Sequence, residues 1–225
     1  MRTGISAIAF DLDGTLYPNS GLYIRLLPFL ARHWPLVAAL GRARNIIREK
    51  QELSSESYVS DFYSYQAQIV AKLLKKPQEQ IREKLDRLIY RGWEPHFLKI
   101  KMFPHVQELL IELRTTPLKL GILSDFPLRS KLKNLGIAEY WDVVLSAEDT
   151  GALKPALRPF SELARALGCP AEHILYVGNS RFCDAHGARR AGMKTALRTS
   201  RFVSDTTVAD FIFHDYRQLH DFVIG

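Results

Sequence analysis

The sequence predicts an α/β fold, in which a doubly wound parallel sheet is interrupted early by a helical insert. Three observations lead to this prediction. Residues 5–10 form a short apolar segment that ends at once in acidic and glycine residues. Residues 21–99 show helical spacing with almost no strand signal, and from Phe103 onward strand and helix patterns alternate. Because parallel strands require crossover connections, this alternation places helices on both faces of a parallel sheet.

The predicted elements follow one another along the core in a regular order. Strands are expected over residues 5–10, 118–123, 142–145, 173–177, 194–197 and 211–213, and helices over residues 106–113, 128–135, 159–167 and 184–191. In the insert, apolar faces at helical spacing come from Ile69, Val70, Leu73 and Leu74, and from Ile81, Leu85, Leu88 and Ile89. We therefore expect a core domain of residues 1–19 plus 100–225 and a helical domain of residues 20–99.

The composition narrows the classes of function. The chain carries a net charge of +7 and has a pI of about 9.4, which favours anionic partners. Four basic residues fall within residues 42–50, but no nucleic-acid-binding motif accompanies them, so no nucleic acid partner is expected. Two cysteines make no disulfide framework, and no segment has the pattern of a secretion signal. These features together predict a cytoplasmic protein.

The most hydrophobic stretch, residues 22–40, is a poor candidate for a membrane span because it contains Arg25, Arg32 and two prolines. No transmembrane segment is therefore expected. We expect its apolar faces to pack inside the helical domain. The alternative left open is a helix that lies on a partner or makes a peripheral contact with a membrane surface.

Two carboxylates, Asp11 and Asp13, follow the first predicted strand, and Gly14 and Thr15 come next. On a loop, carboxylates two residues apart can point into one pocket and attract a hard cation such as Mg²⁺. One carboxylate can attack phosphorus and form an aspartyl-phosphate. The other can donate a proton to the leaving oxygen and later take one from water. Gly14 allows the backbone to approach a bound phosphate closely.

Later strand ends carry further polar groups. The hydroxyl of Ser124 can hold a phosphate oxygen together with neighbouring backbone N–H groups, and Asp125 follows it. Lys154, which precedes a proline, can place its ammonium group against both a phosphoryl group and an attacking carboxylate. After the strand expected over residues 173–177 come Asn179 and Asp184. In a parallel sheet these strand ends meet at one edge, where ligands bind.

These segments resemble a known family. Residues 10–16, Phe-Asp-Leu-Asp-Gly-Thr-Leu, are similar to the first motif of the haloacid-dehalogenase superfamily, and Ser124, Lys154-Pro155 and residues 176–184 resemble its other three motifs in order. The resemblance implies a Rossmann-like core, a helical cap inserted after the first motif, and a phosphohydrolase that uses Mg²⁺. It assigns the nucleophile to Asp11, the general acid/base to Asp13, and contacts with the phosphoryl group to Ser124 and Lys154.

The resemblance is incomplete at two positions. Asp125 stands where the family commonly has Asn, and Asn179 stands where it usually has an acidic residue that touches the metal. The expected metal ligands are Asp11, Asp13, Asn179 and Asp184, and the expected phosphate contacts are Gly14, Thr15, Ser124, Asp125 and Lys154. Three outcomes remain open at Asn179: its carbonyl ligates Mg²⁺, Asp184 moves in or acts through water, or the metal binds weakly.

Together these residues predict a phosphatase that hydrolyses the phosphate ester of a small metabolite with Mg²⁺. Asp13 favours phosphate esters over carbon–halogen bonds, because the dehalogenases of the family lack an acidic residue there. Two alternatives stay open: a phosphotransferase on the same scaffold, and a weak or inactive binding or scaffold protein, which Asn179 would support. Five basic or aromatic residues of the insert could contact an anionic or ring-bearing substrate, but exposed or packing roles are favoured for each of them: Arg25, Arg44, Tyr58, Tyr63 and Trp93.

Overall fold

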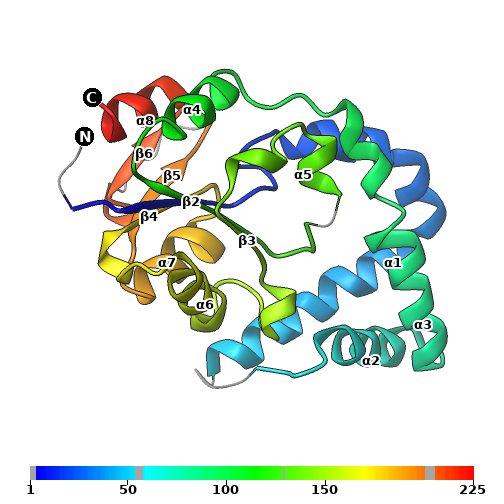
Figure 1. The fold of residues 1–225 in the computed structure, drawn as a ribbon. Helices are drawn as coiled ribbons and strands as arrows, with labels where there is room; N and C mark the ends of the chain where they lie inside the picture. The colour runs from blue at the N-terminus through cyan, green and yellow to red at the C-terminus, as the bar shows by residue number, and fades with distance from the viewer. Residues whose placement is uncertain (1–3, 54–57, 129, 201–205) are drawn as a thin grey trace.

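The computed structural model describes residues 4–53, 58–128, 130–200 and 206–225, and its centre is a six-stranded sheet (Figure 1). The strand order is β3-β2-β1-β4-β5-β6, and all neighbouring strands pair in parallel. The strands are β1 (Ala7–Phe10), β2 (Lys119–Ser124), β3 (Val143–Ser146), β4 (Ile174–Gly178), β5 (Lys194–Arg198) and β6 (Phe211–Phe213). This architecture confirms the predicted α/β fold with a parallel sheet.

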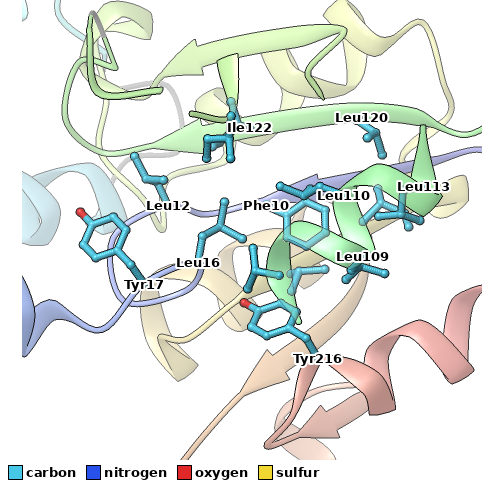
Figure 2. Packing of buried hydrophobic residues seen from close by; sticks show 14 of the residues in the cluster. Phe10, Leu12, Leu16, Tyr17, Leu109, Leu110, Leu113, Leu120, Ile122 and Tyr216 are labelled. Atoms are coloured by element: carbon cyan, nitrogen blue, oxygen red, sulfur yellow. The ribbon is translucent and has the colours of Figure 1, made fainter. Parts of the chain in front are cut away.

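Helices cover both faces of the sheet, as predicted. They are α4 (Val106–Leu113), α5 (Lys131–Asn134), α6 (Leu157–Leu167), α7 (Gly187–Arg190) and α8 (Tyr216–Val223). Ile8 and Phe10 of β1 pack in a cluster with residues of α4 and α8, and Figure 2 shows Phe10 beside Leu110. Ala7 and Ala9 point the other way, into a cluster with residues of α6 and α7. Successive side chains of a strand point to opposite faces, so β1 is buried on both sides.

Three elements of the core differ from the prediction. Of the helix expected over residues 128–135, the regular part among the described residues is α5, and residue 129 lies outside the described residues. The helix expected over residues 184–191 is divided: its first residues belong to a π-helix that spans Arg181–His186, and α7 follows. Helix α8 was not predicted, although a capping box between Asp215 and Gln218 marks its start. Reciprocal capping bonds of this kind are a sequence signal of a helix N-terminus.

The regular elements among the described residues of the insert are all helices. The insert contains α1 (Asn19–Leu53), α2 (Phe62–Leu74), α3 (Gln78–Lys84), a π-helix (Leu85–Tyr90) and a 3₁₀ helix (Glu94–Lys99). Figure 1 shows α2 and α3 lying beside the later part of α1, where a separate hydrophobic cluster forms. Leu22, Leu26 and Phe97, however, pack in the cluster of the sheet. The boundaries of the two domains at residues 19 and 100 stay a prediction.

Residues 22–40 lie in α1, and their packing is only partly as expected. Leu22, Leu26, Leu36 and Leu40 are buried, but Tyr23, Ile24, Leu27 and Trp34 are 52%, 66%, 57% and 62% exposed. The apolar stretch therefore has one packed face and one open face, and the peripheral contact considered for it stays a prediction. No helix among the described residues is long and apolar enough to cross a membrane. Leu73 of α2, predicted on a buried face, is 40% exposed.

Candidate active site

The predicted site residues gather where three adjacent strands end. Asp11 follows β1, Ser124 ends β2 and Asn179 follows β4. Because β1 lies between β2 and β4 in the sheet, the carboxyl ends of these strands are neighbours. Lys154 arrives from the loop before α6. The structure thus brings together groups that are up to 173 positions apart in the sequence, from Asp11 to Asp184 (184 − 11).

Asp11 is buried and held from two sides. Its Oδ1 lies 2.6 Å from Nζ of Lys154, and its Oδ2 accepts a hydrogen bond of 2.7 Å from the hydroxyl of Thr15. Burial raises the pKa of Asp11 to about 7; Lys154 opposes this rise, and the nearby carboxylates of Asp184 and Asp13 add to it. The effect of burial on the pKa of Asp11 therefore outweighs the opposing effect of Lys154.

Lys154 links Asp11 to Asp184. Its Nζ lies 2.7 Å from Oδ1 of Asp184 and donates to the hydroxyl of Tyr176 at 3.1 Å. Burial alone would lower the pKa of Lys154, but Asp11 and Asp184 raise it well above its ordinary value. The other oxygen of Asp184 accepts the backbone N–H groups of Asn179 and Ser180 at 3.1 and 2.9 Å. Asp184 therefore fixes both the lysine and the loop after β4.

The side chain of Asp13 points away from this ion pair. It accepts hydrogen bonds from the hydroxyl groups of Tyr17 and Ser124, the latter at 3.1 Å. Nζ of Lys131, in α5, lies 3.8 Å from Oδ2 of Asp13. A carboxylate in this position can exchange a proton with a group bound next to it. Asp11 and Asp13 are thus two residues apart but have different partners, which suits two different tasks.

Gly14 and Thr15, in the loop after β1, lie against Asn179 in the loop after β4. Gly14 has φ of +88°, and a Cβ atom there would lie 2.6 Å from Nδ2 of Asn179 and 2.7 Å from Nδ2 of Asn19. Any larger residue would therefore collide with both amides. The hydroxyl oxygen of Thr15 is also 3.1 Å from Oδ1 of Asn179. The side-chain oxygen of Asn179 consequently lies beside the group that holds Asp11.

Asp125 faces α1 and the backbone of Lys154. One carboxylate oxygen accepts the backbone N–H of Lys154 at 3.0 Å, and the other lies 2.6 Å from Nη2 of Arg48 and 3.5 Å from Nη2 of Arg44. Burial alone would raise the pKa of Asp125, but these arginines and Lys154 hold it below its usual value. Arg44 is buried and also pairs with Glu148, as its expected packing role requires. The contact of Asp125 with phosphate stays a prediction, while its contacts tie α1 to the loop of Lys154.

The Asp125→Asn substitution tests the contribution of these contacts between Asp125 and α1 to stability. We expect it to lower the free energy of unfolding by about 1–3 kcal/mol, because Arg48 and Arg44 lose a shared anionic partner in a largely buried place. Urea denaturation measures the change. The control is Glu162→Gln, which removes an exposed pair with Arg165 and should change stability by less than about 0.5 kcal/mol. Equal effects of the two substitutions would contradict this reading.

The oxygen atoms around Asp11 could bind a metal ion, but few of them carry negative charge. In the described part of the chain, no group of three or more His, Cys, Asp or Glu residues is placed to hold a metal ion. The reason is visible in two residues: Asn179 is neutral, and the carboxylate of Asp13 is engaged by Tyr17 and Ser124. The side-chain oxygens of Asp11, Asp184 and Asn179 are hard donors, and the two carboxylates already hold the ammonium group of Lys154 between them. Mg²⁺ needs only one or two carboxylates besides water and substrate phosphate, so the donors fit it.

A cavity of about 80 Å³ adjoins Asp13. Six of the residues that line it are Asp13, Tyr23, Trp93, Phe97, Phe126 and Lys131. Sequence reasoning missed Lys131, and for Trp93 it favoured a packing or exposed role over a contact with the substrate. No spacing rule marks either residue, because each reaches the cavity only through the docking of α5 and the insert on the sheet. A larger cavity of about 620 Å³, between α2–α3 and β3, contains none of the predicted site residues.

Most of the chain matches one family model. Residues 8–197, from β1 to β5, match the family model described as haloacid dehalogenase-like hydrolase. The chain therefore belongs to the haloacid dehalogenase-like hydrolases, as its motifs predicted.

Individual relatives agree with this family. The glyceraldehyde 3-phosphate phosphatase of Methanopyrus kandleri is 30% identical, with 97% of each chain covered. The phosphoglycolate phosphatase of Salmonella typhi is 28% identical, with 96% of this chain and 91% of the relative covered. The solved HAD phosphatase from Thermococcus onnurineus has a TM-score of 0.66 at 26% identity over 98% and 99% of the two chains. The solved L-2-haloacid dehalogenase RSc1362 has the same TM-score at 27% identity over 99% and 100%. These matches confirm the predicted class of enzyme, a phosphatase of the haloacid dehalogenase type.

Proposed function

We propose that this protein is a magnesium-dependent phosphomonoester hydrolase that acts on a small phosphorylated metabolite through an aspartyl-phosphate on Asp11. The observation that carries the proposal is the arrangement of two carboxylates with separate partners. Asp11 is buried and held by Lys154 and Thr15, whereas Asp13 borders a small cavity. The phosphatase relatives, whose names specify small phosphate esters, support the same class of substrate.

The reaction divides between these residues in two steps. A carboxylate oxygen of Asp11 attacks phosphorus, and the bond from phosphorus to the leaving oxygen breaks while Asp13 supplies a proton to that oxygen. Water then attacks the aspartyl-phosphate, Asp13 takes its proton, and inorganic phosphate leaves. The ammonium group of Lys154 and the hydroxyl of Ser124 lie close enough to Asp11 and Asp13 to hold phosphoryl oxygens during both steps.

Oxygen atoms of Asp11, Asn179 and Asp184, together with the backbone carbonyl of Asp13, would hold Mg²⁺. When bound, Mg²⁺ offsets negative charge on the phosphoryl oxygens. Removing the metal tests this part of the proposal. Phosphate release from a panel of monoesters should be lost in EDTA and return when Mg²⁺ is added in excess. Release that persists at full rate in EDTA would contradict the role of the metal.

Asn179→Asp is expected to strengthen binding of Mg²⁺. The substitution adds a third carboxylate beside Asp11 and Asp184, so the Mg²⁺ concentration that gives half-maximal activity should fall on the order of tenfold, equivalent to about 1.4 kcal/mol. The measurement is phosphate release during a Mg²⁺ titration. Gln107→Glu adds the same charge at an exposed position of α4 and should leave the titration unchanged. An unchanged titration for Asn179→Asp would remove this residue from the metal site.

Asn179 also favours one second candidate, a binding protein with a weak metal site. If the parent and Asn179→Asp both release no phosphate although they are folded, this candidate gains support. The phosphotransferase alternative is distinguished by stoichiometry. Inorganic phosphate that appears as fast as the ester disappears counts against transfer to a second substrate.

A further inference from the structure

Lys131 places a nearly buried ammonium group at the cavity beside Asp13. The residue is only 7% exposed, and its Nζ lies 3.8 Å from Oδ2 of Asp13. The rings of Phe97 and Phe126 lie 4.9 and 5.4 Å from the same atom. No hydrogen bond from the ammonium group is recorded within the described ranges of the chain, although such a group has three donors. A nearly buried cation with unused donors favours an anionic ligand.

Trp93 makes a second, independent observation at the same cavity. It lines the cavity, and its indole N–H is buried without a hydrogen-bond partner among the residues that the structure describes. An indole nitrogen can only donate a hydrogen bond. A buried donor that stays unsatisfied costs free energy, so a ligand with an acceptor oxygen would remove that cost. Both residues therefore favour a ligand with acceptor oxygen atoms, and Lys131 favours one that is negatively charged.

The position and the size of the cavity limit the ligand further. The cavity adjoins Asp13, which protonates the leaving oxygen in the proposed reaction, so it is the place for the leaving group. Its volume of about 80 Å³ is small beside the roughly 300–1,000 Å³ of pockets for larger ligands. The rings of Phe97, Phe126 and Trp93 form part of its lining, and such an apolar surface strengthens the attraction between a cation and an anion.

We propose that the leaving group carries a carboxylate, which Lys131 and Trp93 bind, so that the substrate is a small phosphorylated hydroxy acid. The inference rests on the proposed function, since the cavity is assigned to the leaving group through Asp13. It adds what the proposed function leaves open, the charge of the metabolite. An aldehyde or an alcohol of the same size offers Trp93 an acceptor but gives Lys131 no anion besides the more distant carboxylate of Asp13.

The experiment compares two esters that differ mainly in this charge, 2-phosphoglycolate and 2-hydroxyethyl phosphate. We expect the parent to prefer the acid at least tenfold in kcat/KM. Lys131→Met keeps an unbranched side chain between Phe97 and Phe126 but removes the charge, and it should lower kcat/KM for the acid at least tenfold more than for the alcohol. Trp93→Phe, which removes only the N–H donor and part of the ring system, should reduce the preference about threefold. Lys133→Met, an exposed lysine of the same helix, is the control and should leave the preference as it is.

Two outcomes overturn the inference. One is a parent that hydrolyses both esters equally well. The other is an equal loss for both esters in Lys131→Met, which would mean that Lys131 acts on Asp13 or on folding instead of on the leaving group. Failure of the proposed function is separate, because the parent would then hydrolyse neither ester. In that case calorimetric binding of the two esters to Asp11→Asn, with and without Lys131→Met, still decides: loss of the acid's advantage in the double variant supports the inference, and equal binding of both esters overturns it.

Discussion

Asp11→Asn should lower the rate of phosphate release by roughly 10⁴-fold or more, the scale seen when a nucleophile is removed. An amide oxygen is a poor nucleophile toward phosphorus, and the aspartyl-phosphate cannot form from it. The single amide oxygen of asparagine can accept from either Thr15 or Lys154, so one of these two interactions is kept. Binding of the ester should therefore change far less than turnover. Steady-state phosphate release and calorimetric binding of the ester measure the two effects.

The fold of Asp11→Asn must stay intact for this result to be informative. Burial already raises the pKa of Asp11, so a neutral side chain is compatible with the position. Far-UV circular dichroism should match that of the parent, and the urea denaturation midpoint should fall less than in Lys154→Met, because Asp184 still pairs with Lys154. Full activity in a folded Asp11→Asn protein would exclude Asp11 as the nucleophile.

Lys154→Met should lower the free energy of unfolding by about 3–5 kcal/mol and also abolish most activity. The ammonium group is buried between Asp11 and Asp184, at 2.6 and 2.7 Å. Removing it leaves two buried carboxylates without a cation, and such broken buried pairs are among the most destabilising substitutions. Urea denaturation at neutral pH measures the loss.

Two further variants identify the cause of this loss. Lys133→Met also replaces a lysine by methionine, but at an exposed position, and should change the free energy of unfolding by less than about 0.5 kcal/mol. Adding Asp184→Asn to Lys154→Met removes one of the unpaired charges and should recover part of the stability. If Lys154→Met is as stable as Lys133→Met, the ion pairs of Lys154 do not hold the site together.

The sequence was informative where local chemistry decides the structure. The apolar β1 followed by Asp11 and Asp13 predicted a buried strand with a polar loop, and strand ends in a parallel sheet meet by topology. Gly14 was expected to allow a close approach; the structure adds the positive φ and the amide of Asn179 that a Cβ would strike. Such features depend on a few neighbouring residues and on general rules of parallel sheets.

Contacts between distant elements could not be predicted in the same way. The pairing of Asp125 with Arg48 spans 77 positions and depends on how α1 crosses the sheet edge. Lys131 is one of many lysines in the sequence, and only the packing of α5 against Phe97 makes it a buried one. Helix α8 is a different case, since the capping residues Asp215 and Gln218 were available as a signal.

Direct detection of the phosphorylated enzyme tests the central claim, the aspartyl-phosphate on Asp11. Asp13→Asn should slow the attack of water on this intermediate, while p-nitrophenyl phosphate, whose leaving group needs no proton, still allows the first step. Acid quenching during turnover, digestion and mass spectrometry then locate the phosphoryl group. We predict one phosphoryl group on the peptide that contains Asp11, removed by hydroxylamine and absent when Asp11→Asn is added. A burst of nitrophenol with no phosphorylated peptide, or with the phosphoryl group on another residue, would contradict the mechanism.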